Sequence, residues 1–249
     1  MEVLRFYNIG FSEFVRIVSM WGPPTEKIFR KNLVAHFTGN TDPDSLKITY
    51  ERISQYYALR LMMSFQREDD VEGFVKVMNG HERRLGRKMN VIDYGCGVSD
   101  LGLIVASLGH HVTICDLDDS KLDFTFCRYK RNDFTVNVIA ILDTEKLPDL
   151  REGEFDIIIA SEIMKQVRHP LALLRLFYRI LKPSGLFYCT QGTPESGWFG
   201  SKAEGDRLEE AIQIGNSGAY KQFFQTHFVK YTESEDRKYW WVPVRDPEN

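Results

Sequence analysis

The sequence predicts an α/β fold in which helices cover both faces of a mostly parallel, doubly wound seven-stranded sheet. Two observations lead to this. From Met89 onward, short apolar runs alternate with amphipathic segments, which is typical of strand–helix–strand units. The first apolar run also enters a glycine turn, Gly95-Cys96-Gly97, directly before a helix. With 249 residues and 43% hydrophobic residues, the chain can bury the core of one large domain.

Apolar runs place five strands, and the third and fourth are read as the unbroken runs that a sheet buried on both faces requires. We predict these strands at Val91–Tyr94, Val112–Asp116, Val136–Leu142, Phe155–Ser161 and Leu186–Thr190. Amphipathic segments place helices from an N-cap at Ser99 to Gly109, over Ser120–Arg131, and from Pro170 to the turn Lys182–Gly185.

The two ends of the chain break this rhythm. Two late apolar runs, His227–Tyr231 and Tyr239–Val244, predict an antiparallel hairpin that completes the sheet. Residues 1–88 carry apolar side chains at helical spacing and predict a helical cap. We therefore divide the chain into a cap (1–88) and a ligand-binding domain (89–249), with an insertion at 192–220 that contributes a helix and part of the substrate pocket.

Composition and net charge restrict the kinds of partner that this chain can bind. A net charge of -3 argues against nucleic acid and against a basic membrane surface. No segment has the length and hydropathy of a membrane span, and the N-terminal residues lack a signal-peptide layout. The four cysteines form no CxxC pair and are expected to be buried thiols in a reducing compartment. These features predict a cytoplasmic protein, and they leave its oligomeric state open.

The glycine turn indicates a nucleoside ligand without phosphate. Asp116 ends the second strand about 20 residues after the turn, where an acid can bind both hydroxyls of a ribose. A dinucleotide site requires a third glycine, but this chain has Asp100 there, and its carboxylate would repel a pyrophosphate. The sequence also lacks the G-x-x-x-x-G-K-[ST] loop of ATP-binding proteins.

Five segments over Met89–Thr190, in order, resemble the motifs of class I S-adenosylmethionine-dependent methyltransferases of the small-molecule type. They are Val91–Gly97, Asp116–Asp118, Leu142–Pro148, Phe155–Glu162 and Leu181–Leu186, the last with Ser184 in place of a glycine. A further segment, Tyr50–Tyr57, resembles a helix that precedes this domain in many members. The resemblance implies a Rossmann-like fold, S-adenosyl-L-methionine as the cofactor, and methyl transfer.

The resemblance also implies roles for single residues. Gly95 and Gly97 would face the methionine moiety, Asp116 would hold the ribose, and Asp143 would accept from the adenine amino group. The complete implied cofactor set is Tyr50, Tyr57, Asp93, Gly95, Cys96, Gly97, Asp116, Leu117, Asp143, Thr144 and Ser161.

Several of these residues have a structural alternative. Asp93 and Asp143 could brace turns, and Tyr50 and Tyr57 could be core aromatics. His110 and His111 are expected to form a surface pair, and no motif predicts a metal site.

The catalytic base is left unassigned. Gln166 stands where many small-molecule members have a histidine, and glutamine cannot take a proton at neutral pH. The remaining catalytic candidates are Tyr57 and Glu162.

Three functions are therefore considered. The first is methyl transfer to a small molecule whose acceptor atom (O, N, C or S) the sequence does not reveal. The second is non-methyl chemistry on the same cofactor: aminocarboxypropyl transfer, cyclisation or cleavage that yields methylthioadenosine. The third is a non-catalytic binding subunit with this fold.

Overall fold

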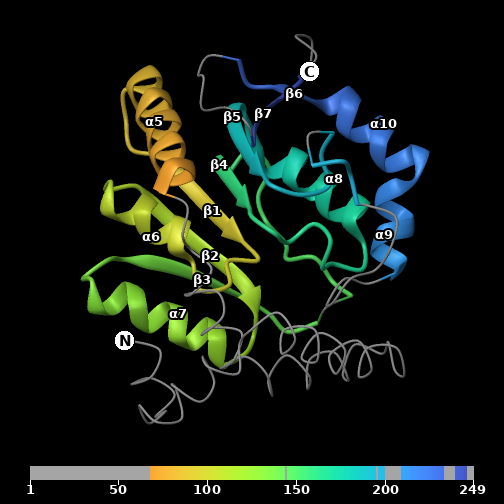
Figure 1. Cartoon of the computed structure of the whole chain (residues 1–249). Coiled ribbons are helices and arrows are strands. Elements are labelled where there is room, and N and C mark those ends of the chain that lie inside the picture. The colour runs from red at the N-terminus through yellow and green to blue at the C-terminus, as the bar shows by residue number, and fades with distance from the viewer. Residues whose placement is uncertain (1–67, 144, 195, 200–208, 233–238, 246–249) are drawn as a thin grey trace.

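The computed structural model describes residues 68–143, 145–194, 196–199, 209–232 and 239–245. Its centre is a seven-stranded sheet in the order β3-β2-β1-β4-β5-β7-β6 (Figure 1). The strands are β1 (Asn90–Tyr94), β2 (His111–Leu117), β3 (Val136–Ile141), β4 (Phe155–Ala160), β5 (Leu181–Cys189), β6 (Phe228–Lys230) and β7 (Trp240–Pro243). The first five are parallel, whereas β7 pairs antiparallel with both β5 and β6. The predicted Rossmann-like sheet and its C-terminal hairpin are confirmed.

Six described helices cover the two faces of the sheet (Figure 1). On one face lie α5 (Glu68–Leu85), α6 (Asp100–Ser107) and α7 (Ser120–Arg131). On the other face lie α8 (Pro170–Ile180), α9 (Glu209–Asn216) and α10 (Gly218–His227). Each face has its own cluster of buried apolar side chains, so β1, β4 and β5 are covered on both sides.

Helix α5, the last part of the predicted cap, packs directly on the sheet. The Phe74 ring centroid lies 5.2 Å from those of both Tyr188 and Trp240. Residues 1–67 of the predicted cap lie outside the described residues, and the division at residue 88 stays a prediction.

Four local expectations were wrong. The turn expected at 182–185 is a bulge inside β5, because Leu181 already pairs with Phe155. β3 is an edge strand rather than a strand buried on both faces, and Val138 on it is 41% exposed. Only His111 of the histidine pair is exposed, since His110 is buried and accepts from the Met89 N–H at 3.4 Å.

The fourth error concerns Ser99. It does precede α6, but its side chain makes no capping hydrogen bond. The Ser99 Oγ instead donates to Asp93 Oδ2 at 2.7 Å. The hydroxyl thus joins the start of α6 to the end of β1 and does not accept from the first N–H groups of the helix.

The amino ends of β1 and β4 are tied together by Asp156, which is fully buried. Arg87 donates to both carboxylate oxygens, at 2.9 and 2.6 Å, and the Asn90 N–H donates at 2.8 Å. Lys182 adds an ion pair at 3.0 Å. This cluster fixes the relative position of the strands whose opposite ends form the site described next.

No helix among the described residues is long and apolar enough to cross a membrane.

Candidate functional site

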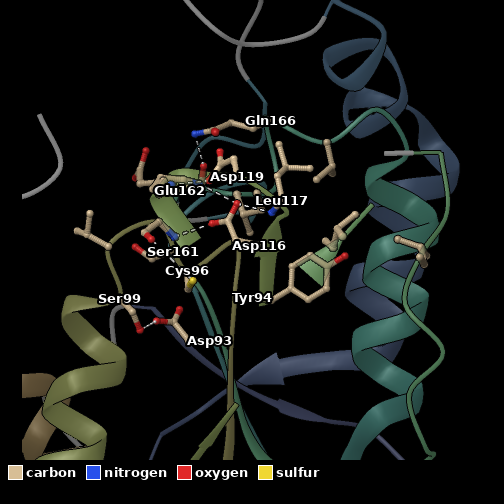
Figure 2. A pocket seen from close by; sticks show the side chains of 18 of the residues that line it. Asp93, Tyr94, Cys96, Ser99, Asp116, Leu117, Asp119, Ser161, Glu162 and Gln166 are labelled. Atoms are coloured by element: carbon tan, nitrogen blue, oxygen red, sulfur yellow. Dashed lines mark hydrogen bonds and ion pairs between the residues drawn. The ribbon is translucent and has the colours of Figure 1, made fainter. Parts of the chain in front are cut away.

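A cavity of about 540 Å³ opens at the carboxyl ends of β1, β2 and β4 (Figure 2). The strand order reverses between β1 and β4, and ligands of open α/β sheets bind at such switch points. The volume lies within the usual range for small-molecule sites. Its wall is formed by the glycine turn, the ends of β2 and β4, and the residues after β3 and β4.

The glycine turn forms one side of the cavity. Both Gly95 (φ 65°) and Gly97 (φ 56°) adopt left-handed backbone conformations that favour glycine. A Cβ on Gly95 would lie 2.4 Å from the Ile163 side chain, so the packing of the turn also requires glycine there. The turn is held by the Gly95 N–H, which donates to the Cys115 carbonyl at 2.7 Å, and by the Thr125 hydroxyl, which donates to the Gly97 carbonyl at 2.7 Å.

Below the turn, Asp93 and Ser99 form a buried polar pair with Tyr129 (Figure 2 shows the first two). The Ser99 Oγ and the Tyr129 hydroxyl are 2.9 Å apart. Ser99 has a left-handed backbone (φ 55°), which is costly for a residue with a Cβ. Burial raises the pKa of Asp93 to about 7, although the Ser99 hydrogen bond acts in the opposite direction.

Asp116 lies at the end of β2 and is 7% exposed. Its Oδ2 accepts from the Gly97 N–H at 2.7 Å, which links the second strand to the glycine turn (Figure 2). Its Oδ1 accepts from the Leu117 N–H and from the Lys121 ammonium, each at 2.8 Å. The carboxylate predicted to bind ribose is therefore oriented by three donors of the chain itself.

The opposite rim carries Glu162, which follows β4 and has φ 60°. Its backbone N–H donates to the Thr190 hydroxyl at 2.9 Å, and its carboxylate accepts from the buried Gln191 amide. The Gln166 amide donates to the Glu162 carbonyl at 2.8 Å (Figure 2). Gln166 thus holds this part of the cavity wall in place.

The segments after β3 and β4 together form a third part of the cavity wall. Arg168 pairs with Glu145 at 2.6 Å and with Glu210 of α9 at 3.4 Å. His169 also approaches Glu145, at 3.3 Å. Asp143 is not part of the described wall. It accepts from the Glu145 N–H at 2.9 Å and pairs with Lys146 at 3.1 Å, so it braces the turn here.

Most of the predicted cofactor residues come together. Those in the cavity wall are Asp93, Gly95, Cys96, Gly97, Asp116, Leu117 and Ser161, and the catalytic candidate Glu162 joins them. Tyr50, Tyr57 and Thr144 lie outside the described residues. No described residue of the 192–220 insertion lines this cavity, although Glu210 contacts Arg168 of the wall.

Sequence reasoning missed Asp119 and Lys121, which also line the cavity. Asp119 Oδ1 caps α7 by accepting from the backbone N–H groups of Lys121 and Leu122. Its Oδ2 is buried and has no hydrogen-bond partner among the described residues. The sequence did contain a signal for these two residues. An acid directly before the helix predicted at Ser120 is a typical N-cap, and this position places Asp119 and Lys121 next to Asp116.

These groups suit an unphosphorylated nucleoside. The glycine turn leaves room for a ligand at the strand ends, and two buried carboxylates with one ammonium match hydroxyl and amino groups. In the described part of the chain, no group of three or more His, Cys, Asp or Glu side chains could hold a metal ion.

Comparison with known proteins agrees with this geometry. A family model described as a methyltransferase domain matches residues 85–224. A ubiquinone biosynthesis O-methyltransferase of Colwellia psychrerythraea is 28% identical over 100 residues, which are 40% of this chain and 40% of that protein. The protein of the same name from Paraburkholderia xenovorans is 29% identical over 114 residues, 45% and 48% of the two chains. The matches thus span less than half the length of these curated relatives.

A solved structure of the bifunctional kinase-methyltransferase WbdD has a TM-score of 0.50 to this chain at 17% identity. The superposition covers 70% of this chain and 39% of that one. At this identity the likeness concerns the fold alone.

Proposed function

Because this chain belongs to the methyltransferase domain family, whose cofactor is S-adenosylmethionine, we propose that it transfers a methyl group from that cofactor to a hydroxyl of a small molecule. One observation carries the proposal: Asp116, the glycine turn and Glu162 line a single cavity at the switch point of the sheet. The cavity thus has a place for a nucleoside at one end and a carboxylate at the other.

The cofactor end is formed by the glycine turn and the end of β2. Asp116 would accept from the ribose hydroxyls, while Gly95 and Gly97 would let the methionine part approach the backbone. Leu117 and Ile141 provide apolar wall for the adenine ring. When bound, S-adenosylmethionine supplies an electrophilic methyl group. The wall residues need only orient the acceptor and exclude water.

At the acceptor end, Glu162 is the described carboxylate best placed to take a proton from a hydroxyl. The buried Gln191 amide and the Thr190 hydroxyl approach its two oxygens, and this fixes the direction in which the carboxylate points. A held carboxylate can align the lone pair of an attacking oxygen and accept its proton. Glu162 therefore takes the role that Gln166 cannot serve.

Three features support a small acceptor. The cavity is of small-molecule size, the net charge of -3 disfavours a nucleic-acid backbone, and the curated relatives carry the name of O-methyltransferases of ubiquinone biosynthesis.

The test is an incubation of the protein with S-adenosylmethionine and a panel of small hydroxylated molecules, followed by mass spectrometry of both products. We expect S-adenosylhomocysteine together with a methylated acceptor, and Glu162→Gln should lower the rate at least tenfold. Methylthioadenosine as the nucleoside product would instead indicate non-methyl chemistry. Absence of cofactor binding would indicate a non-catalytic subunit.

A further inference from the structure

We propose that Lys121 is a second ribose-binding residue, which acts with Asp116 as a donor–acceptor clamp on the 2′,3′-diol of the nucleoside. This inference rests on the proposed function, because it presupposes that the nucleoside lies against Asp116. The resemblance to methyltransferases did not include Lys121. The assignment comes from its position in the cavity wall and from its hydrogen bonding.

The first observation is the position of the ammonium. Lys121 lies in the first turn of α7 and is 7% exposed, yet it lines the cavity. Its Nζ donates to Asp116 Oδ1 at 2.8 Å, and this is its one hydrogen bond among the described residues. A lysine ammonium has three N–H donors. Two donors are therefore available beside the carboxylate that the ribose would approach.

The second observation is that Asp116 retains little capacity to accept further hydrogen bonds. A carboxylate offers about four acceptor positions. Three are already used by the Gly97 N–H, the Leu117 N–H and Lys121. About one position is left, on Oδ2, so Asp116 alone cannot readily accept from both hydroxyls of a diol.

A diol can bind despite the few acceptor positions left on Asp116, because each of its hydroxyls both donates and accepts hydrogen bonds. One hydroxyl can donate to the open position on Asp116 Oδ2. The neighbouring hydroxyl can accept from the Lys121 ammonium, which lies on the other oxygen of the same carboxylate. The pair thereby offers one acceptor and one donor to two adjacent hydroxyls.

The charges around Lys121 keep its ammonium protonated and disfavour a ligand that carries phosphate. Burial alone would lower the pKa of the Lys121 ammonium, but attraction to Asp116 and Asp119 raises it, so the lysine stays protonated. Two carboxylates against one ammonium leave this wall net negative. A nucleotide with a phosphate on its ribose would therefore be repelled.

The experiment is a calorimetric titration of the full chain with two ligands, S-adenosylhomocysteine and its 2′,3′-dideoxy analogue. Lys121→Met should bind S-adenosylhomocysteine about tenfold more weakly than the wild type, whereas the dideoxy analogue should bind both proteins within about twofold. Lys121→Gln, which retains an N–H donor, should fall between them. Lys130→Met is the matched control, because Lys130 is an exposed lysine on the same helix.

Each other outcome is distinguishable. Unchanged binding of S-adenosylhomocysteine by Lys121→Met would overturn the clamp, and tighter binding would overturn it by showing that Lys121 competes with the ribose for Asp116. An equal loss for the dideoxy analogue would show that Lys121 supports the site without contacting the ribose hydroxyls. If Lys121→Met does not fold, as judged by its melting curve, the Lys121→Gln comparison decides. A wild-type protein that binds neither ligand would contradict the proposed function itself.

Discussion

Two buried aspartates on neighbouring strands have pKa values shifted in opposite directions. At the amino end of β4, burial would raise the pKa of Asp156, but hydrogen bonds from Arg87, a backbone N–H and Lys182 hold it at about 2. Near the carboxyl end of β1, burial raises the pKa of Asp93 to about 7, and its described side-chain donor is the neutral hydroxyl of Ser99. Asp156 has two cationic donors, whereas Asp93 has, among the described residues, only neutral donors, the Ser99 hydroxyl and a backbone N–H, and lies near the carboxylates of Asp116 and Asp100.

The same contrast holds between the two ends of the parallel strands. We call the side with their amino ends the amino edge, and the side with their carboxyl ends, where the cavity opens, the carboxyl edge. At the amino edge, the buried carboxylate is fully satisfied by cations and a backbone donor. At the carboxyl edge, Asp119 Oδ2 lacks a described partner, and Ser99 and Glu162 have left-handed backbones. Strain and unmet hydrogen-bonding capacity gather at functional sites because a ligand uses them. The amino edge thus contributes stability, and the carboxyl edge is where we propose that the ligand binds.

The largest expected effect is on stability, from Asp156→Asn. This variant leaves Arg87 and Lys182 without their buried counter-charge, and we expect a loss of about 3 kcal/mol in the free energy of unfolding. Affinity for S-adenosylhomocysteine should not change, because Asp156 lies at the edge opposite the cavity. Urea unfolding measures the first quantity and calorimetry the second. Asp149→Asn, an exposed aspartate, is the control, and equal stability of the two variants would contradict the role of Asp156.

The next effect is on binding, from Asp116→Ala. It should cost about 1.5–3 kcal/mol in affinity for S-adenosylhomocysteine, the scale of hydrogen bonds to a charged group. It should also lower stability, because the buried Lys121 ammonium loses its counter-charge. Unchanged affinity in a calorimetric titration would remove Asp116 from the ribose site.

A third prediction uses pH to separate the two aspartates. The folded-state pKa of Asp93 lies above its ordinary value of 3.8, so the folded state holds the proton more tightly than the unfolded chain. Its contribution to stability is therefore greatest below about pH 4 and is lost as the pH rises toward 7. Between pH 5 and 8 this loss should amount to about 2 kcal/mol.

Asp93→Asn should remove most of this decrease, as measured by urea unfolding at both pH values. Asp156 behaves with the opposite sign: its stabilisation is present above pH 4 and is lost as the pH falls toward 2. An identical pH dependence of the wild type and Asp93→Asn would rule out the assigned role of Asp93.

The smallest expected effect concerns Ser99. Ser99→Ala keeps the strained backbone and loses the hydrogen bond to Asp93, whereas Ser99→Gly loses the same bond but relieves the strain. We expect Ser99→Gly to be more stable than Ser99→Ala by about 1 kcal/mol. Thermal unfolding of the two variants would show whether this position needs its serine or merely tolerates it.

The strands, and the positions of the glycine turn and Asp116 at the strand ends, were predictable because local chemistry determines them. Apolar runs and a glycine turn fixed β1, β2 and α7 to within two residues, and Asp116 follows from the end of β2. It is harder to predict which polar groups keep unused hydrogen-bonding capacity, because this depends on the partners that neighbouring segments supply. The Lys121 contact with Asp116 and the Gln191 contact with Glu162 join side chains whose pairing only the folded chain reveals.

Errors arose where long-range contacts outweigh local signals. Lys182-Pro183-Ser184-Gly185 has the composition of a turn, but pairing of Leu181 with Phe155 draws it into β5 as a bulge. β3 has the apolar sequence of an inner strand, and only the strand order reveals that it lies at the edge. Helix α10 was not predicted, because its aromatic residues, such as Tyr220 and Phe224, fit a strand or a helix equally well until they pack on α8 and β7.

The most direct test of the central claim is a side-by-side calorimetric titration of Asp116→Ala and Asp156→Asn with S-adenosylhomocysteine, at a temperature where both are folded. The account predicts that Asp156→Asn binds like the wild type despite its lower stability, and that Asp116→Ala binds at least tenfold more weakly. Weakened binding by Asp156→Asn together with unchanged binding by Asp116→Ala would contradict the assignment of binding to the carboxyl edge of the sheet.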